Sequence, residues 1–121
     1  MTDLEQRHAE LVEDLFKPGV QIHHDLSADD CEIIHATLGV AGEAGEIVDA
    51  VKKFTVYRKP CDRDNLIEEL GDMEFFLQAL RKRLFISREE TLEANVNKLS
   101  KRYSSGSYSD KQAQDRADKQ G

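Results

Sequence analysis

The chain has 121 residues, of which 39% are apolar and 34% charged, which fits a single soluble domain over 1–121. Its formal net charge is −7, and so acidic a chain repels a phosphate backbone, which argues against a nucleic-acid binder. Two cysteines are too few for a disulfide framework, and without a membrane-length apolar run or a signal-peptide pattern we expect a cytoplasmic protein with no membrane partner.

The first predicted helix covers about residues 3–16. Thr2 followed by Glu5 is a capping-box pattern that opens it, and a Pro-Gly pair ends it. We expect the next segment, which contains His23 and His24, to be a solvated loop.

Two longer helices follow. Ser27 can cap a helix over about 28–55, and either Asp62 or Asp64 can cap another that ends near Leu84. Few segments have the alternation of polar and apolar residues that is typical of a strand, so we expect an all-helical protein.

A fourth helix is predicted from Ser87, which forms a capping box with Glu90, to about Tyr103. The remainder, 104–121, is a short polar tail with one helical turn near its middle. The sequence therefore predicts an all-α fold, a four-helix bundle with its core in about 27–103 and a short C-terminal tail.

The second helix carries two acids in an unusual setting. Glu43 and Glu46 lie on one face of it, and their neighbours on that face are small or apolar: Ala36, Gly39, Val40, Ile47, Ala50 and Phe54. Other sides of this helix are apolar too, which predicts a central helix or one packed against a partner subunit.

The third helix repeats the pattern with Glu69 inside a broad apolar face and Asp72 at its edge. Burying an unpaired carboxylate is costly, so Glu69 must pair with a base, be protonated, or bind a cation. The bases of this helix lie three turns or more away, so a cation is the simplest explanation.

Together these residues predict a metal site. Two acid pairs at i,i+3 spacing, on helices that can face each other, form a set of four carboxylates: Glu43, Glu46, Glu69 and Asp72. Such a set of hard oxygen ligands suits Mg²⁺, with Mn²⁺ as a possible substitute, and offers no thiolate or imidazole for zinc. The alternative is that these acids are ordinary helix-surface residues.

The two motifs carry a specific resemblance. Gly42-Glu43-Ala44-Gly45-Glu46, followed 23 residues later by Glu69-Leu70-Gly71-Asp72, resembles the ExxE…ExxD signature of the all-α nucleotide pyrophosphohydrolases, the MazG and dimeric dUTPase-like superfamily. The resemblance covers about residues 27–119. Many members have a glutamate where this chain has Gly42, a position that the metal ligands do not require.

The resemblance implies an enzyme that hydrolyses a nucleoside triphosphate between the α and β phosphates, releasing monophosphate and pyrophosphate. It implies the four acids as ligands of Mg²⁺ and leaves the proton acceptor open among them and Glu68. A dedicated dUTPase is an alternative within the same class. A non-catalytic interaction protein that binds metal or nucleotide is the alternative from another class.

Substrate contacts are expected elsewhere. Asn95, Lys98 and Arg102 share one face of the fourth helix, in a segment that resembles the family's phosphate-binding segment; otherwise they form a solvated face. Bases near the turn between the second and third helices, among them Lys53, are secondary phosphate candidates. Lys119 would close over the triphosphate if the tail orders.

His35 lies on the side of Glu43 and Glu46, about 12 Å before Glu43 along the helix. That distance suits contact with the base or ribose of a nucleotide rather than with the metal, and a structural histidine is the alternative. Because the second helix is apolar on more faces than a small monomer covers, a homodimer or homotetramer is expected, as in the family it resembles.

Overall fold

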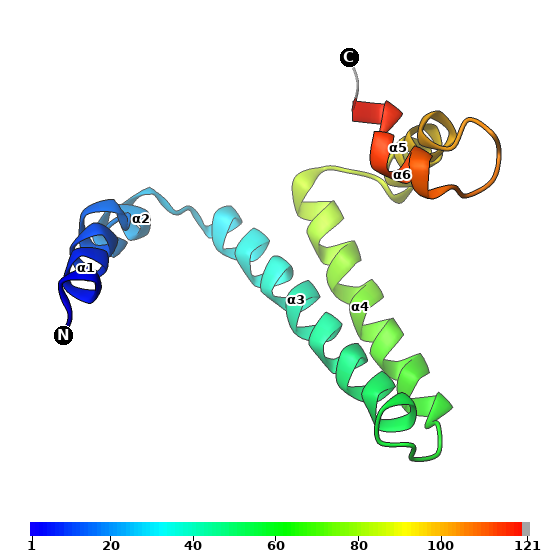
Figure 1. The fold of residues 1–121 in the computed structure, drawn as a ribbon, viewed down its shortest axis with the longest axis horizontal. Helices are drawn as coiled ribbons and strands as arrows, with labels where there is room; N and C mark the ends of the chain where they lie inside the picture. The colour runs from blue at the N-terminus through cyan, green and yellow to red at the C-terminus, as the bar shows by residue number, and fades with distance from the viewer. Residues whose placement is uncertain (120–121) are drawn as a thin grey trace. The chain divides into compact units, whose positions relative to one another are not determined.

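The computed structural model describes residues 1–119, and every regular element in them is helical (Figure 1). The elements are α1 (Asp3–Leu15), α2 (Gly19–Asp25), α3 (Ala28–Thr55), α4 (Arg63–Leu84), α5 (Arg88–Arg102), α6 (Asp110–Asp115) and the 3₁₀ turn η1 (Ala117–Lys119). This confirms the predicted all-α class. The chain divides into two compact units, Met1–Glu32 and the part that begins at Ile33. No described helix is long and apolar enough to cross a membrane.

The helix ends follow local sequence chemistry. In α1 the backbone N–H of Glu5 donates to the Thr2 hydroxyl at 3.1 Å, and the Glu5 carboxylate accepts from the Thr2 N–H at 2.7 Å. Ser87 and Glu90 form the same capping box at the start of α5. Asp62 caps α4, through the N–H of Asn65. These caps explain why the predicted boundaries agree with the observed ones.

The loop predicted around His23 and His24 is wrong, because these residues belong to α2. Pro18 both ends the preceding helix and begins this one, with φ −61° and its carbonyl accepting from the N–H groups of Gln21 and Ile22. Proline is compatible with the first turn of a helix, since the N–H that it lacks has no partner there.

In the second unit α3 and α4 run side by side in opposite directions (Figure 1). The closest approach is at Gly39, where a Cβ atom would collide with the ring of Phe76. The His35 ring contacts the same phenyl ring edge-on, with 6.2 Å between centroids. A glycine therefore sets the distance between the two helices one turn before Glu43.

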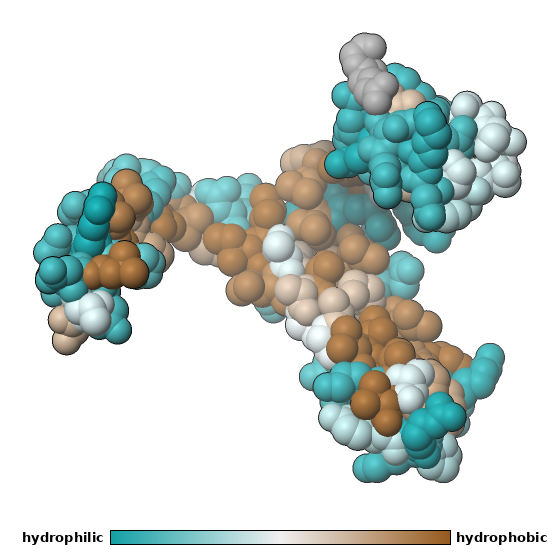
Figure 2. Space-filling view, in the orientation of Figure 1, coloured by the Kyte–Doolittle hydropathy of each residue, from teal (hydrophilic) through white to brown (hydrophobic). Residues whose placement is uncertain are grey.

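The apolar surface of α3 and α4 is largely uncovered. Within residues 1–119 only Ala36 and Ala50 are buried apolar side chains, at 3% and 8% exposure. Leu38 is 66% exposed and Phe75 67% exposed, and apolar side chains lie open on the surface (Figure 2). The expected burial of α3 on more than one side is therefore not achieved within this chain.

The C-terminal tail packs on α5 through α6 and η1. Arg102 of α5 and Asp118 of η1 make two contacts, Nε to Oδ1 at 2.8 Å and Nη2 to Oδ2 at 3.3 Å. Near the same end of α5, the rings of Tyr103 and Tyr108 lie 5.6 Å apart. The expected helical turn in the tail is confirmed as α6.

Candidate metal centre

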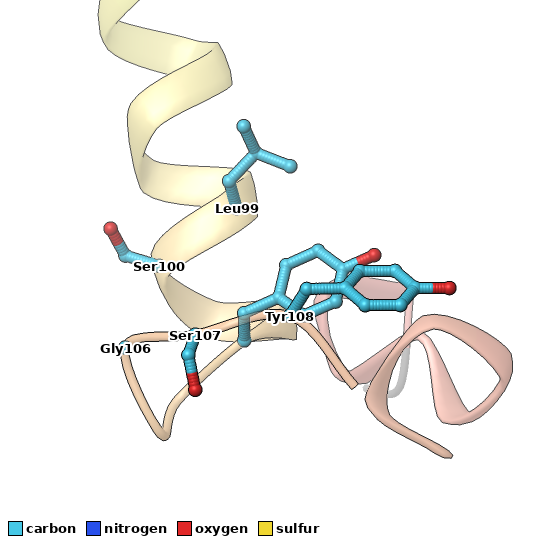
Figure 3. A pocket seen from close by; sticks show the side chains of 6 residues that line it. Leu99, Ser100, Gly106, Ser107 and Tyr108 are labelled. Atoms are coloured by element: carbon cyan, nitrogen blue, oxygen red, sulfur yellow. The ribbon is translucent and has the colours of Figure 1, made fainter. Parts of the chain in front are cut away.

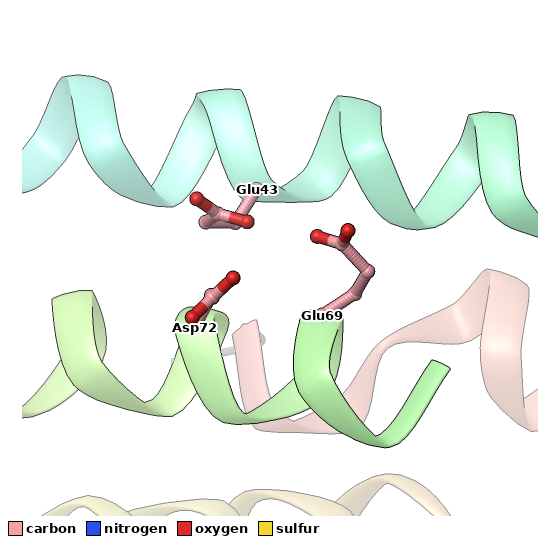
Figure 4. Close-up of side chains that lie close together, drawn as sticks. All are labelled: Glu43, Glu69 and Asp72. Carbon is pink, nitrogen blue, oxygen red and sulfur yellow. The ribbon is translucent and has the colours of Figure 1, made fainter. Parts of the chain in front are cut away.

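Three of the four predicted ligands converge between α3 and α4. Glu43 offers a carboxylate oxygen from α3, and Glu69 and Asp72 offer theirs from α4, all within 4.8 Å of one another. The three carboxylates point into the space between the helices (Figure 4). Glu69 and Asp72 share a face because three residues are nearly one helical turn. We call these three residues the acid group.

The acid group is electrostatically unbalanced. Partial burial raises the pKa of Glu69 above its ordinary value, and the carboxylates of Glu43, Glu46 and Asp72 raise it further. Glu43 Oε2 is buried and has no hydrogen-bond partner. No base in the described part of the chain forms an ion pair with these three acids.

Such an arrangement fits a divalent cation. A buried carboxylate oxygen without a donor is costly, and three carboxylates at this separation repel one another. A hard cation with oxygen ligands removes both penalties, because it coordinates the free oxygen and neutralises the charge. The donor set of the acid group therefore suits Mg²⁺ or Mn²⁺.

The remaining predicted acids lie outside this group. Glu46 is exposed one turn further along α3, yet its charge contributes to the raised pKa of Glu69. Glu68 is exposed and directly precedes Glu69 on α4. Since adjacent helix residues point about 100° apart, Glu68 does not share the direction of the acid group.

The predicted phosphate face of α5 is partly occupied. Arg102 is only 16% exposed and holds the Asp118 carboxylate, which is 5% exposed; we call this contact the tail ion pair. Arg102 and, to a smaller extent, Lys98 lower the pKa of Asp118, so both cations act on one carboxylate. Asn95 is exposed on α5. Sequence reasoning missed Asp118, because nothing local marks a partner 16 residues away.

Of the other predicted substrate residues, two lie on α3 and one lies in η1. His35 is exposed on α3 beside Phe76, whose ring also packs edge-on against Phe75 at 5.1 Å. Lys53 pairs with Asp49 at 3.4 Å, one turn before it on α3. Lys119, in η1, is exposed.

Hollows in the described part of this unit include two near the helices of interest. One, of about 360 Å³, is at the end of α5 and is lined by Leu99, Ser100, Tyr103, Gly106, Ser107 and Tyr108 (Figure 3). The other, of about 420 Å³, is at the turn between α3 and α4 and is lined by Ala50, Lys53, Lys59, Pro60, Asp62 and Asn65. We call the second one the turn hollow. Of these two, the turn hollow draws residues from both helices that carry the acid group.

Comparison with known proteins gives one family. The model of the MazG nucleotide pyrophosphohydrolase domain matches residues 33–106, which is more than half of the chain and includes the acid group. Gene 37 protein of Mycobacterium phage L5 is 34% identical over 87 residues, which cover 65% of this chain and 76% of that protein. No solved structure matches the chain significantly.

Proposed function

Since the chain belongs to the MazG nucleotide pyrophosphohydrolase family, we propose that it hydrolyses nucleoside triphosphates to the monophosphate and pyrophosphate with Mg²⁺ as cofactor. The observation that carries this proposal is the acid group, whose three carboxylates converge without a base to balance them. The family gives the reaction, and the acid group gives the chemistry that this reaction needs.

Glu43, Glu69 and Asp72 would hold the cation, and Glu46 would complete the set by turning toward them. Divalent cations at such sites neutralise charge on phosphate oxygens and make a bound water easier to deprotonate. The raised pKa of Glu69 supports its place in this set, because a carboxylate crowded by other carboxylates gains most from a cation. The acid that takes the proton from water is left open among these four acids and Glu68, which directly precedes Glu69.

Asn95, Lys98 and Arg102 would bind phosphate oxygens, and the tail ion pair supports this role. The face already binds an anionic group, since the Asp118 carboxylate accepts two hydrogen bonds from Arg102. A phosphate offers the same oxygen geometry to a guanidinium, so it would displace Asp118. Lys119 directly follows Asp118 and would move with it.

The active form would be a homodimer or homotetramer in which copies of α3 and α4 pack into a four-helix bundle. The uncovered apolar side chains of the two helices support this: Ile34, Leu38, Val48, Ile67, Leu70 and Phe75 are all 44–67% exposed. An apolar surface of this extent on a small protein marks an interface. Sedimentation at micromolar concentration would show an oligomer, and a stable monomer would contradict this part of the proposal.

The test is pyrophosphate release from a panel of nucleoside and deoxynucleoside triphosphates with Mg²⁺ and with Mn²⁺. Glu69→Gln should remove activity, whereas Glu74→Gln, the same change at an exposed position of α4, should keep it. Metal-dependent nucleotide binding without product would favour a non-catalytic binding protein. Full turnover in Glu69→Gln would contradict the metal site.

A further inference from the structure

The turn hollow continues the face of the acid group toward the loop. Counted from the acid group, Ala50 lies two turns after Glu43 on α3, and Asn65 lies one turn before Glu69 on α4. At 1.5 Å per residue, these steps are about 10 Å along α3 and about 6 Å along α4. Ala50, which is buried, has a small side chain and therefore does not fill the space between the two helices. A ligand held at the acid group therefore has beside it a hollow of about 420 Å³ that begins one turn from Glu69 along α4.

Two cations line this hollow. Lys53 comes from α3 and Lys59 from the loop, and the N–H of Lys59 donates to the carbonyl of Lys53 at 2.9 Å, which ties the loop to the helix. The Lys53–Asp49 pair is exposed on both sides, 57% and 63%, so it holds Lys53 weakly. The Lys53 ammonium is thus available to a ligand, and Lys59 is exposed beside it.

The lining has one acid, Asp62, and its carboxylate is already engaged. It accepts the N–H of Asn65 at 3.1 Å as the cap of α4. The Asn65 side chain adds an amide that can donate to an anion. The lining residues, two lysines and an amide against one capping carboxylate, therefore carry a net positive charge beside the negative acid group.

The opposite end of the same face is aromatic. His35 lies two turns before Glu43 on α3, and Phe76 lies one turn after Asp72 on α4, with their rings in contact. The face thus runs from aromatic rings, through carboxylates, to lysines. A nucleoside triphosphate has the matching order of aromatic base, metal-binding phosphates and terminal anionic phosphate.

We propose that the turn hollow is the subsite for the terminal phosphate of the substrate, with Lys53, Lys59 and Asn65 as its contacts and the nucleoside directed toward His35 and Phe76. This inference rests on the proposed function and adds a direction to it. When the bond between the α and β phosphates lies at the acid group, the γ phosphate reaches the turn hollow. A nucleoside diphosphate leaves the hollow empty, so the enzyme should favour triphosphates.

The first test compares the full-length protein with Lys59→Met and, as a control, Lys82→Met, which makes the same change at an exposed position about 20 Å from Glu69 along α4. We expect the ratio of kcat/KM for a triphosphate to that for its diphosphate to fall roughly tenfold in Lys59→Met, the loss of one charged hydrogen bond. Asn65→Ala should lower the ratio less, and Lys82→Met should leave it unchanged. An unchanged ratio in the Lys53→Met, Lys59→Met double variant would overturn the proposal.

A second measurement separates this inference from the proposed reaction. Calorimetric titration with inorganic pyrophosphate and Mg²⁺ should show roughly tenfold weaker binding to Lys59→Met and unchanged binding to Lys82→Met. If the wild type turns over no nucleotide but the titration gives this result, the reaction is wrong and the subsite stands. If pyrophosphate binds wild type and Lys59→Met equally, or binds neither, the subsite is wrong whatever the turnover.

Discussion

The acid group and the tail ion pair both contain carboxylates, but only the carboxylate of the tail ion pair has a basic partner. Asp118 is more deeply buried than the acids of α3 and α4, but Arg102 satisfies both of its oxygens. The acid group has three carboxylates, one of them with a buried oxygen that no donor reaches. A carboxylate with a partner can stabilise a fold, whereas carboxylates gathered without one repel each other until one is protonated or a cation binds.

The largest effect should come from Glu69→Gln, which turns the unbalanced site into a more balanced one. It removes one negative ligand, so pyrophosphate release with Mg²⁺ should fall by about a hundredfold or more. Asp118→Asn, at the satisfied site, should leave this release within a few-fold of wild type when both are measured at saturating substrate. Equal losses in the two variants would remove the distinction between the two sites.

The next effect concerns the distance between the helices that carry the acid group. Gly39→Ala should destabilise the protein by about 1–3 kcal/mol, because the new methyl group collides with the Phe76 ring. Gly42→Ala is the matched control, since a Cβ there meets nothing, and it should stabilise α3 by up to about 1 kcal/mol. Urea unfolding of both variants measures the difference. Equal free energies of unfolding would show that Gly39 does not set the spacing.

A smaller effect should appear at the tail ion pair. If Arg102 binds phosphate, Asp118→Asn frees it, and the apparent affinity for triphosphate should rise by up to about tenfold. Asp115→Asn is the control, because Asp115 pairs with Lys111 at 2.8 Å on the exposed surface of α6. The KM for triphosphate, measured for wild type, Asp118→Asn and Asp115→Asn, tests this prediction. A weaker affinity in Asp118→Asn would mean that the ordered tail helps to bind substrate.

The smallest effects should be in the pH dependence of stability, where the two sites have opposite signs. The pKa of Glu69 is raised in the fold, so its contribution is present at low pH and is lost as the pH rises through that pKa. The pKa of Asp118 is lowered by Arg102, so its contribution is present above the ordinary aspartate pKa and is lost as the pH falls.

Melting temperatures in chelator between pH 3 and 7 test these signs. Relative to wild type, Glu69→Gln should gain stability toward pH 7, and Asp118→Asn should lose it. The same direction of change in both variants would contradict the assignment of one site as unsatisfied and the other as satisfied.

Most features that depend on local chemistry are predictable from the amino-acid sequence. The starting points of α1, α4 and α5 follow from their N-cap residues, Thr2, Asp62 and Ser87, whose side chains accept hydrogen bonds from the first turn of each helix. The i,i+3 spacing of Glu69 and Asp72 gave their common direction, and the structure brings Glu43 to meet them. That they bind metal stays a prediction.

The features that the sequence did not predict depend on contacts between distant residues, on residues that suit two local structures, or on side-chain rotamers. The tail ion pair joins residues 16 positions apart, so no periodicity reveals it. A proline is common both just after a helix and at the start of one, so Pro18 alone does not tell whether a loop or a new helix follows. Glu46 shares the face of Glu43 by geometry, but its exposed side chain lies outside the acid group, because helical spacing fixes a direction and not a rotamer.

The most direct test is a calorimetric titration of the metal-free protein with Mn²⁺ and Mg²⁺, without nucleotide. Convergence of Glu43, Glu69 and Asp72 predicts saturable binding in the wild type and in Glu74→Gln, and at least about tenfold weaker binding in Glu43→Gln and in Glu69→Gln. Equal binding by all four proteins, or no binding by the wild type, would contradict a metal site between α3 and α4.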